Sequence, residues 1–413
     1  MQQICVMGLG YIGLPSASLL ATKGFQVHGV DVNPKVVEAL NSGEILIHEP
    51  SLDVMVKSAV ASGRLTADIK PQDADIFIMA VPTPFNAGHT PNTDYIQAAC
   101  KAIAPYLKAG NLVILESTSP VGTTEKVCAW IKEERPDLVM PGDENGREQI
   151  YVAHCPERVL PGRILIELVS NDRVVGGVDN RSTDKAVDFY KSFVEGKVCA
   201  TNARTAELVK LTENAFRDVN IAFANELSLI CDELNVSVWE TITLANRHPR
   251  VNILQPGPGV GGHCIAVDPW FIVSSTPQTA RLIRTAREIN DHKPQVVIDM
   301  VKSKLSRFTA PVLACLGLSF KANIDDLRES PALHIVEQLA GEQVAQMLVV
   351  EPYIDELPAS LRDSANLKKC DLKQALDAAD VILLLVDHNH FKHVDKASLL
   401  GKVVVDTRGI YAG

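Results

Sequence analysis

The first 31 residues place the strongest constraint on what this chain can fold into. A short apolar run at residues 3–8 leads directly into Gly8-Leu9-Gly10-Tyr11-Ile12-Gly13, and a helical pattern follows over 14–23. A second apolar run, 25–30, ends at Asp31. A strand, a glycine-rich turn, a helix and a second strand closed by an acid make up the whole dinucleotide-binding fingerprint. The sequence therefore predicts a βαβ unit at the N-terminus.

The parts of this fingerprint suit an NAD molecule. The glycines allow the tight turn and the close approach of the pyrophosphate, which sits on the helix N-terminus. Asp31 would accept hydrogen bonds from the adenosine ribose hydroxyls and repel a 2′-phosphate, so NAD is favoured over NADP. The alternative is an ordinary βαβ turn that binds nothing. The predicted cofactor contacts in this unit are Gly8, Gly10, Tyr11, Ile12, Gly13 and Asp31.

An alternation of strands and helices continues through most of the chain. Residues 204–234 interrupt it with one long helical pattern that contains no Gly or Pro. We predict an α/β fold with two Rossmann-like, doubly wound parallel-sheet domains joined by a long central helix, with domains at 1–203, 204–300 and 301–413. No GxGxxG follows the first strand of the last domain, so this domain should bind something other than a second dinucleotide. Further strands are predicted at 74–81, 111–116, 150–154, 309–318, 344–350, 381–385 and 402–406.

Polar loops follow three of the predicted strands. Thr83 follows the strand at 74–81, Ser117 and Thr118 follow 111–116, and Glu157 follows 150–154. Open parallel sheets bind their ligands at the carboxyl ends of the strands, which makes these residues candidates for a site. Ser117 and Thr118 could equally be plain helix caps. Glu157 is a candidate acid/base group, although a lone loop carboxylate is more often simply solvated.

A glycine-rich loop at 257–262 leads into His263 and Cys264, and Asp268 follows four residues later. A thiol at the start of a helix is favoured as the thiolate by the unpaired N–H groups and the helix dipole. If one helical turn follows Cys264, Asp268 lies on the same face as the sulfur. Asp268-Pro269 can also be an N-cap and a first helical residue, which would start the helix later. The alternative for Cys264 is a buried structural cysteine.

The long helix carries Lys210, Asn214 and Arg217, which are four and three residues apart and share one face. Such a polar face is usually solvated, but it can also line a cleft. A helix that joins two α/β lobes can also pack against a second copy of itself. A basic segment at 246–250 precedes the glycine-rich loop.

Composition narrows the possible partners and the location. The chain has 413 residues and a net charge of -10, which argues against a general nucleic-acid or anionic-membrane surface. Nine cysteines, an odd number without a CxxC pair, suggest a reducing compartment and no metal site. No apolar run reaches membrane-spanning length without a charge or a break. We expect a cytoplasmic protein.

Together these motifs resemble the UDP-glucose/GDP-mannose dehydrogenase family of nucleotide-sugar 6-dehydrogenases, over essentially the whole chain. The sequence of residues 257–265 is similar to that of the branch that acts on UDP-N-acetylhexosamines. The sequence of residues 245–256 is most similar to that of members that use UDP-N-acetyl-D-mannosamine. Such members supply UDP-N-acetyl-mannosaminuronic acid for bacterial surface polysaccharides, for example enterobacterial common antigen. The resemblance rests on the fingerprint, Ser-Thr-Ser-Pro-Val-Gly at 117–122, Cys-Pro-Glu-Arg at 155–158, Lys-Leu-Thr-Glu-Asn at 210–214, the cysteine loop, and the segment 320–330.

The resemblance implies a four-electron oxidation of a primary alcohol to a carboxylate with two NAD⁺ in turn, through a thiohemiacetal and a thioester on Cys264. It also implies a homodimer formed through the long helix, with Arg250 reaching into the partner subunit's substrate site. The implied catalytic residues are Cys264, Lys210, Asp268, Asn214, Glu157 and Thr118. Further cofactor contacts are Thr83, Thr118 and Arg328. The implied UDP-sugar contacts are Glu157, Arg158, Val159, Lys210, Asn214, Arg217, His248, Arg250, Gly257, Gly261 and Lys321.

Three alternatives remain at this point. The same chemistry could act on UDP-N-acetylglucosamine, UDP-N-acetylgalactosamine or UDP-glucose, because no motif in the sequence reads the orientation of one sugar substituent. A single-oxidation dehydrogenase or an epimerase would keep the fold and use Cys264 only structurally. A sensor would bind a UDP-sugar without turnover, which the intact set of cysteine, lysine and aspartate argues against.

Overall fold

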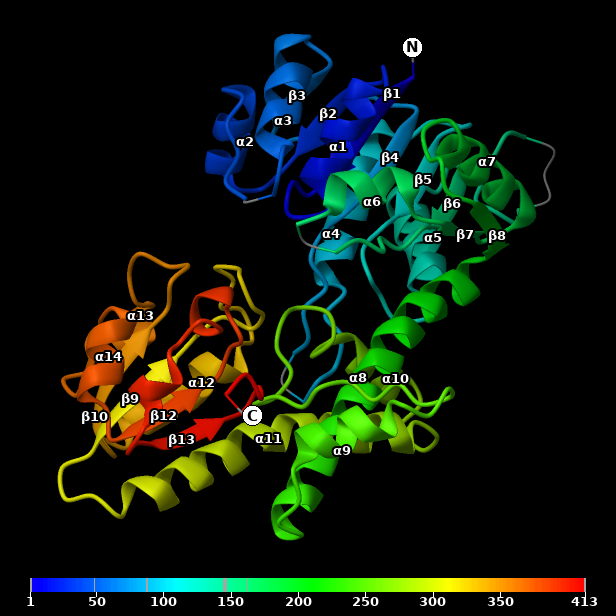
Figure 1. Cartoon of the computed structure of the whole chain (residues 1–413). Coiled ribbons are helices and arrows are strands. Elements are labelled where there is room, and N and C mark those ends of the chain that lie inside the picture. Colours follow the sequence, from blue (N-terminus) through cyan, green and yellow to red (C-terminus); the bar gives the residue numbers. More distant parts are fainter. Residues whose placement is uncertain (1, 48, 87, 144–146, 161, 412–413) are drawn as a thin grey trace. The chain divides into compact units, whose positions relative to one another are not determined.

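The computed structural model describes residues 2–47, 49–86, 88–143, 147–160 and 162–411. The chain divides into two compact units, Met1–Glu213 and Asn214–Gly413, each with its own β-sheet (Figure 1). The predicted fold class is confirmed: both sheets are dominated by parallel pairing, and a long helix lies in the middle of the chain. The three-domain division at 203 and 300 stays a prediction.

The N-terminal sheet has the order β3-β2-β1-β4-β5-β6-β7-β8. Its neighbours pair in parallel except β6 and β7, which are antiparallel, so the sheet is mixed where an all-parallel one was predicted. Strands β3, β7 and β8 were not predicted from the sequence. The strands are β1 (Gln3–Met7), β2 (Gln26–Val30), β3 (Leu65–Asp68), β4 (Ile76–Met79), β5 (Leu112–Leu115), β6 (Tyr151–His154), β7 (Arg173–Gly177) and β8 (Val198–Asn202).

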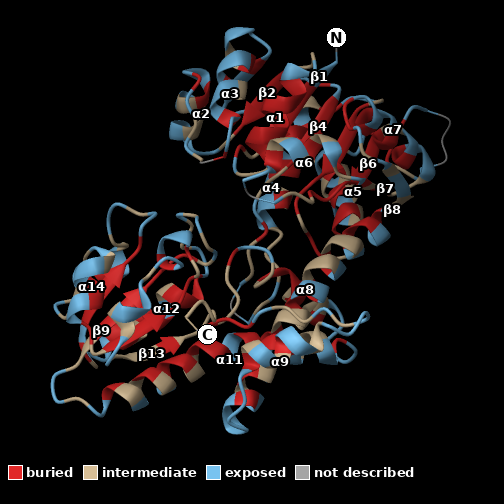
Figure 2. Ribbon diagram, viewed as in Figure 1, coloured by how far each residue is buried: buried red, intermediate tan, exposed pale blue. Residues whose placement is uncertain are grey.

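Helices cover both faces of this sheet because successive strand residues alternate between them. Along β1, Ile4 and Val6 pack on one face with α1, whereas Cys5 and Met7 pack on the other face with α4 and α5. Figure 2 shows the strands between these layers as buried. The helices are α1 (Gly13–Thr22), α2 (Pro34–Asn41), α3 (Leu52–Ala61), α4 (Asp94–Ile103), η1 (Ala104–Tyr106), α5 (Thr123–Glu134), α6 (Ile164–Ser170) and α7 (Asn180–Lys191).

Helix α8 (Ala203–Glu233) is the predicted long helix and runs for 31 residues. Polar residues are part of its buried side: Glu207, Asp218 and Asn225 are each at most 1% exposed. Large apolar residues are part of its exposed side, since Phe216 is 71% and Phe223 is 53% exposed. The helix therefore reverses the usual relation between polarity and burial at several positions.

The C-terminal unit contains a five-stranded parallel sheet in the order β11-β10-β9-β12-β13. Two hydrophobic clusters cover its faces, one of them packed on α11 and α12 and the other on α14. Strand β11 was not predicted from the sequence. The elements are α9 (Val238–Ala245), α10 (Asp268–Ser275), α11 (Arg281–Leu305), β9 (Val312–Leu316), α12 (Pro331–Gly341), β10 (Gln346–Val350), α13 (Ala359–Arg362), β11 (Leu367–Lys369), α14 (Leu372–Ala378), β12 (Val381–Leu384), η2 (Asn389–Phe391), η3 (Lys396–Leu399) and β13 (Val403–Asp406).

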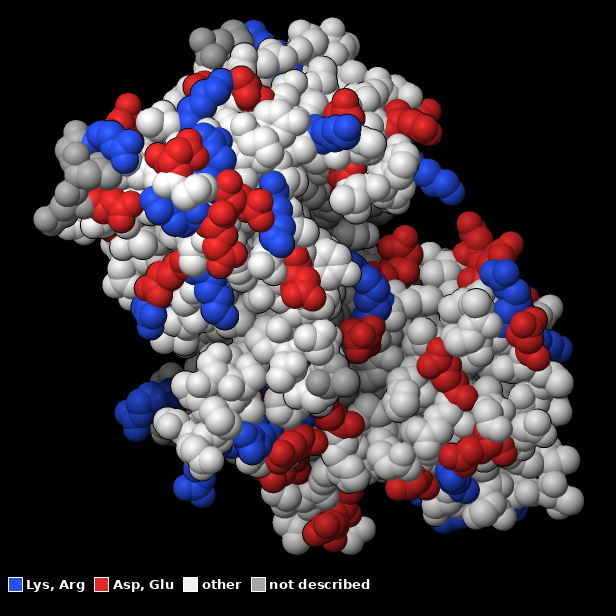
Figure 3. Space-filling view, turned by 180° about the vertical axis from the view of Figure 1, so that it is seen from behind, with Lys and Arg blue, Asp and Glu red and all other residues white. Residues whose placement is uncertain are grey.

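The described helices include none that is long and apolar enough to cross a membrane. Acidic and basic side chains are interspersed over the face of the molecule that Figure 3 shows.

Candidate active site

The glycine turn after β1 has the shape that a dinucleotide phosphate needs. A Cβ on Gly13 would lie 1.8 Å from the carbonyl oxygen of Gly8, so the turn closes only with glycine at the start of α1. A Cβ on Gly10 would meet no heavy atom within 4 Å, which leaves that backbone open to a ligand. Tyr11 and Ile12 are half-buried beside it. These residues fit an NAD pyrophosphate at the N-terminus of α1.

Asp31, which directly follows β2, is fixed beside this turn by two backbone donors. Its Oδ2 accepts a hydrogen bond of 2.9 Å from the N–H of Leu9, and its Oδ1 accepts one of 2.9 Å from the N–H of Asn33. Each carboxylate oxygen keeps a further lone pair for ribose hydroxyls. Asp31 thus also holds the glycine turn in place, which the sequence analysis did not predict.

The loops after β4 and β5 are joined by hydrogen bonds. The Thr83 hydroxyl donates to the backbone oxygen of Thr118 at 2.6 Å, and the Ser117 hydroxyl donates to that of Val81 at 2.7 Å. The helix-cap alternative for Ser117 and Thr118 is wrong, because α5 begins at Thr123 with Gly122 as its N-cap. The two loops are therefore bonded to each other at the carboxyl ends of the adjacent strands β4 and β5.

Glu207 of α8 caps α5 and was missed by the sequence analysis. Its carboxylate accepts hydrogen bonds from the N–H of Gly122 at 2.6 Å and from the N–H of Thr124 at 2.7 Å. Burial raises the pKa of Glu207, and these donors oppose the rise. A carboxylate here is stabilised by the unpaired N–H groups of the helix N-terminus. The position of Glu207 within an apolar helical pattern could have indicated this buried role in the sequence.

Glu157, which follows β6, is 6% exposed, so the solvated-carboxylate interpretation is wrong. Its Oε2 accepts a hydrogen bond of 2.6 Å from the guanidinium of Arg173, and its Oε1 accepts one of 2.7 Å from the N–H of Arg158. Arg173 begins β7 and is 2% exposed. A buried ion pair with these bonds fixes the carboxylate in one orientation. Arg173 was not among the predicted site residues, because β7 itself was not predicted.

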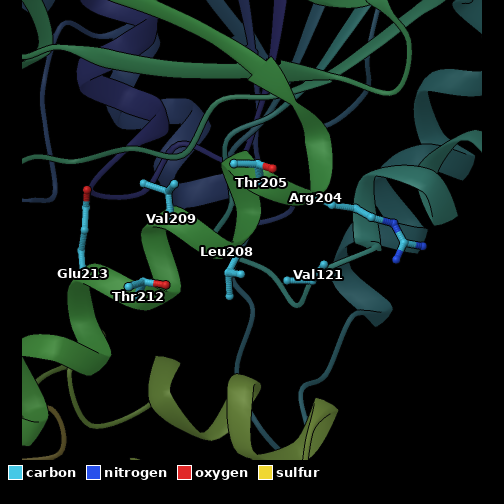
Figure 4. A pocket seen from close by; sticks show the side chains of 7 residues that line it. All are labelled: Val121, Arg204, Thr205, Leu208, Val209, Thr212 and Glu213. Atoms are coloured by element: carbon cyan, nitrogen blue, oxygen red, sulfur yellow. The ribbon is translucent and has the colours of Figure 1, made fainter.

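A cavity of about 530 Å³ brings together the predicted substrate residues Arg158, Val159 and Lys210. The Arg158 guanidinium is held by Glu213 in an ion pair of 2.6 Å. A second cavity, of about 380 Å³, lies against α8 and is shown in Figure 4, where Val121 and Leu208 point into the same space. The residues that line these two cavities all belong to the N-terminal unit. The first is polar and coincides with predicted site residues, whereas the second is mainly apolar.

Cys264 is exposed in the C-terminal unit, so the buried structural-cysteine interpretation is wrong. Its carbonyl oxygen accepts hydrogen bonds from the N–H of Val267 at 3.1 Å and from that of Asp268 at 2.9 Å. The second bond is the i to i+4 bond of one helical turn. Helix α10 then begins at Asp268, with Val267 as its N-cap, so Asp268 is the first helical residue and does not cap the helix. The turn predicted after Cys264 is present.

Helix α8 holds the cysteine loop at two points. The Asn214 amide donates to the Asp268 carboxylate at 2.5 Å, and the N–H of Gly257 donates to the side-chain oxygen of Asn225 at 2.9 Å. The glycines in between let the loop press against its neighbours: a Cβ on Gly261 would lie 2.3 Å from the carbonyl oxygen of Glu329. The loop is therefore fixed at both ends.

Asn225 is the end of a buried polar chain that the sequence analysis missed. Its amide donates to Asn290 at 2.9 Å, and Asn290 of α11 donates to Asp218 at 2.8 Å. Arg287 completes the chain through an ion pair of 2.6 Å with Asp218. Asp218 and Asn225 lie seven residues apart on α8, a spacing that could have indicated a shared buried face.

The remaining predicted residues are mostly exposed. Arg217 lies on the surface of α8, and His248 and Arg250 follow α9, where the Arg250 N–H donates to the His248 ring at 3.3 Å. Lys321 and Arg328 are exposed in the segment after β9, and the Arg328 guanidinium pairs with Asp326 at 2.6 Å.

A cation that the sequence analysis missed lies close to Gly257. A Cβ on Gly257 would lie 2.6 Å from the guanidinium of Arg408, which follows β13 and pairs with Asp387 at 2.8 Å. The position of Arg408 after the carboxyl end of a predicted strand could have indicated this residue in the sequence.

Within the described residues, no group of three His, Cys, Asp or Glu side chains could hold a metal ion.

An α/β unit with a dinucleotide-binding turn, followed by a second Rossmann-like unit without such a turn, fits the class of NAD-dependent dehydrogenases. Residues 2–194 match the NAD binding domain of the UDP-glucose/GDP-mannose dehydrogenase family, 204–292 its central domain and 314–413 its UDP binding domain. The chain belongs to this family and is an NAD-dependent nucleotide-sugar dehydrogenase.

Relatives in this family are similar along nearly their whole length. An NDP-N-acetyl-D-galactosaminuronic acid dehydrogenase of Ralstonia nicotianae is 57% identical over 99% of this chain and 96% of its own. A UDP-N-acetyl-D-mannosamine dehydrogenase of Campylobacter jejuni is 57% identical over 95% of this chain and 97% of its own. Among solved structures, the UDP-N-acetyl-mannosamine dehydrogenase Cap5O of S. aureus has a TM-score of 0.87 at 41% identity, covering 100% of this chain and 96% of that one.

Proposed function

We propose that this protein oxidises the C6 hydroxymethyl group of UDP-N-acetyl-D-mannosamine to a carboxylate, giving the nucleotide-activated uronic acid that bacterial surface polysaccharides use. The observation that carries this proposal is the exposed Cys264, one helical turn before Asp268, whose carboxylate Asn214 binds. A thiolate beside a positioned carboxylate suits the capture of an aldehyde. An enzyme that stops after a single oxidation has no use for this arrangement.

Cys264 supplies the covalent step. Its thiolate adds to the carbon of the aldehyde that the first oxidation forms, and the aldehyde oxygen takes up a proton to give a thiohemiacetal. Oxidation of this adduct leaves a thioester. Water then attacks the thioester carbon, releases the thiolate and provides the second carboxylate oxygen. NAD, when bound, supplies the electron acceptor for each of the two oxidations.

The other catalytic residues move protons and stabilise charge. Lys210 or Asp268, directly or through a water, removes the alcohol proton. Lys210 and Asn214 are four residues apart on α8 and stabilise the oxyanion at C6. Asn214 has a second amide hydrogen for this purpose besides the one that it gives to Asp268. Glu157 acts as an acid/base group, and Thr118 orients the hydrolytic water.

A homodimer formed through α8 is part of this proposal. Phe216, Phe223 and Ile230 follow one another at intervals of seven residues, and they are 71%, 53% and 46% exposed. Residues seven positions apart lie on the same side of a helix, and a second copy of the same helix would cover these apolar side chains. Arg250 would then serve the partner subunit's substrate. Sedimentation that finds only monomers at assay concentrations would contradict this assembly.

We also propose a cytoplasmic location. The reaction needs Cys264 as a reduced thiol, and its side chain is exposed. A reducing compartment such as the cytoplasm keeps such a thiol reduced.

UDP-N-acetyl-D-galactosamine is the second candidate substrate, because the similar Ralstonia relative carries the galactosaminuronic acid name. The two sugars differ only in the orientation of substituents, which a hydrogen-bonding site distinguishes by its geometry. The remaining family substrates, UDP-N-acetylglucosamine and UDP-glucose, serve as comparisons.

The test is the number of NADH formed per UDP-sugar consumed, measured in parallel on these four sugars. We expect two NADH per molecule of UDP-N-acetyl-D-mannosamine and little turnover of the others. Two NADH with the galactosamine sugar alone would keep the mechanism and change the substrate. One NADH or none with every sugar would contradict the covalent mechanism.

Replacing Asp31 should weaken NAD binding and leave UDP-sugar binding unchanged. Asp31→Ala removes the ribose acceptor and also the acceptor for the Leu9 N–H, and we expect a loss of about ten- to a hundred-fold in NAD affinity, as for a hydrogen bond to a charged group. Asp31→Asn keeps an acceptor oxygen without the charge, so it should lose less and should admit NADP better. Calorimetric titration with NAD, NADP and UDP separates these effects. Unchanged NAD affinity in Asp31→Ala would contradict the assigned contact.

A further inference from the structure

A cluster of ionisable side chains is buried in the N-terminal unit at the carboxyl ends of β5 and β6. Glu116 directly follows β5, Glu157 follows β6, Arg173 begins β7 and Tyr190 lies on α7. They are 4%, 6%, 2% and 1% exposed, respectively. Glu116 immediately precedes the loop that carries Thr118, and no role in the reaction described above uses it.

The contacts in this cluster connect the two carboxyl groups through Arg173 and Tyr190. Arg173 binds Glu157 at 2.6 Å, and its guanidinium lies 5.7 Å from the centroid of the Tyr190 ring. The Tyr190 hydroxyl donates to Oε1 of Glu116 at 2.8 Å. The other oxygen of Glu116, Oε2, is buried and makes no hydrogen bond to any residue that the structure describes.

Two carboxyl groups therefore face one guanidinium in a place that water does not reach. Burying a carboxylate without a cation costs far more than burying the neutral acid. Glu157 has the Arg173 guanidinium and the Arg158 N–H, whereas Glu116 has a single hydroxyl donor. Of the two, Glu116 is the one that keeps a proton. Burial raises the pKa of Glu116 to about 7, the charge of Glu157 adds to the rise, and Arg173 and Tyr190 oppose it.

The neighbouring titratable groups hold constant charge near neutral pH. Burial raises the pKa of Cys155 to about 12 and raises that of Tyr190 well above its usual value, so both stay neutral. Burial lowers the pKa of His154 to about 3, so this imidazole stays neutral as well. Among these groups with a shifted pKa, Glu116 is the one whose charge changes near neutral pH.

We propose that Glu116 is a positioning residue which, as a neutral acid, leaves Arg173 paired with Glu157 alone and so keeps the Glu157 carboxyl group correctly oriented. This inference rests on the proposed acid/base role of Glu157. When Glu116 loses its proton, a second negative charge competes for Arg173 and weakens the ion pair that orients Glu157. Activity therefore falls as the pH rises through the pKa of Glu116.

The first test compares pH profiles of kcat for the wild type, Glu116→Gln, Tyr190→Phe and the surface control Glu133→Gln. The wild type should lose activity several-fold as the pH rises past about 7, and Glu116→Gln, which cannot ionise, should lack this limb. Tyr190→Phe removes a donor that favours the carboxylate, so its limb should move to higher pH. The control, which neutralises an exposed carboxylate on α5, should match the wild type. A limb of the same shape and position in Glu116→Gln and the wild type would overturn the proposal.

The second test does not depend on turnover. Infrared difference spectra of the whole protein, Glu116→Gln against wild type, should contain the carbonyl stretch of a buried protonated acid at pH 6 and lose it at higher pH. Absence of that band would show an ionised Glu116 and would overturn the proposal even if the enzyme oxidises its sugar. A band together with no sugar oxidation would instead leave the protonated Glu116 standing and contradict the proposed function. If Glu116 had a purely structural role, Glu116→Gln would change the stability of the protein. In Tyr190→Phe, the pH profile of kcat and the pH at which the carbonyl band disappears would then both match the wild type.

Discussion

Cys264→Ser is expected to abolish formation of the sugar acid, with a rate loss on the order of 10³-fold or more, as for other nucleophile deletions. Serine keeps the shape of the side chain, but its hydroxyl is not ionised near neutral pH as a thiol at a helical turn can be. The aldehyde formed by the first oxidation would then find no thiolate. We expect the ratio of NADH to consumed UDP-sugar to fall from two to at most one, with aldehyde detectable by a hydrazine trap.

A matched variant separates the nucleophile from a general effect of removing sulfur. Cys199 is exposed on β8, at the edge of the N-terminal sheet, and Cys199→Ser should keep the full ratio and rate. Iodoacetamide should inactivate the wild type and Cys199→Ser alike. Full four-electron turnover by Cys264→Ser would contradict the covalent mechanism.

The fold could be predicted from the sequence where a pattern is local. The glycine fingerprint, the apolar strands and the unbroken helix at 204–234 each depend on residues close together in the chain, and each is present in the structure. The missed strands are short or carry polar residues. β7 begins with Arg173, and β8 at the sheet edge is largely exposed, so neither shows the apolar run of a buried strand.

Candidate site residues could be named from the sequence, but their contacts could not. Asn214 and Asp268 are 54 positions apart, and Glu207 lies 85 positions from the Gly122 N–H that it binds. Spacing along one helix gives a face and says nothing of what packs on it. For the same reason, the burial of Asp218 and the exposure of Phe216 on α8 could not be predicted from the sequence, because tertiary contacts determine both.

Arg287→Met should be strongly destabilising because it leaves Asp218 without its cation. Asp218 is fully buried, and Arg287 is 1% exposed. Breaking such a pair from one side typically costs about 3–5 kcal/mol in the free energy of unfolding. The loss should be largest in the C-terminal unit, which contains both residues. Urea unfolding in a Trp130→Phe background follows this unit, since Trp239 and Trp270 then provide the remaining tryptophan signal.

Two further measurements identify the uncompensated charge as the cause. Asp218→Asn/Arg287→Met removes the charge but keeps an acceptor for Asn290, so it should recover most of the loss. Burial already raises the pKa of Asp218, against the opposing effect of Arg287. Without Arg287 the folded state binds this proton more tightly than the unfolded chain does, so Arg287→Met should gain stability as the pH falls and lose it as the pH rises. Equal losses in the single and double variants would instead point to lost packing of the long side chain.

Because Asn290 connects Asp218 to Asn225 and hence to Gly257, the single variant should also alter the alkylation rate of Cys264, whereas the double variant should restore it.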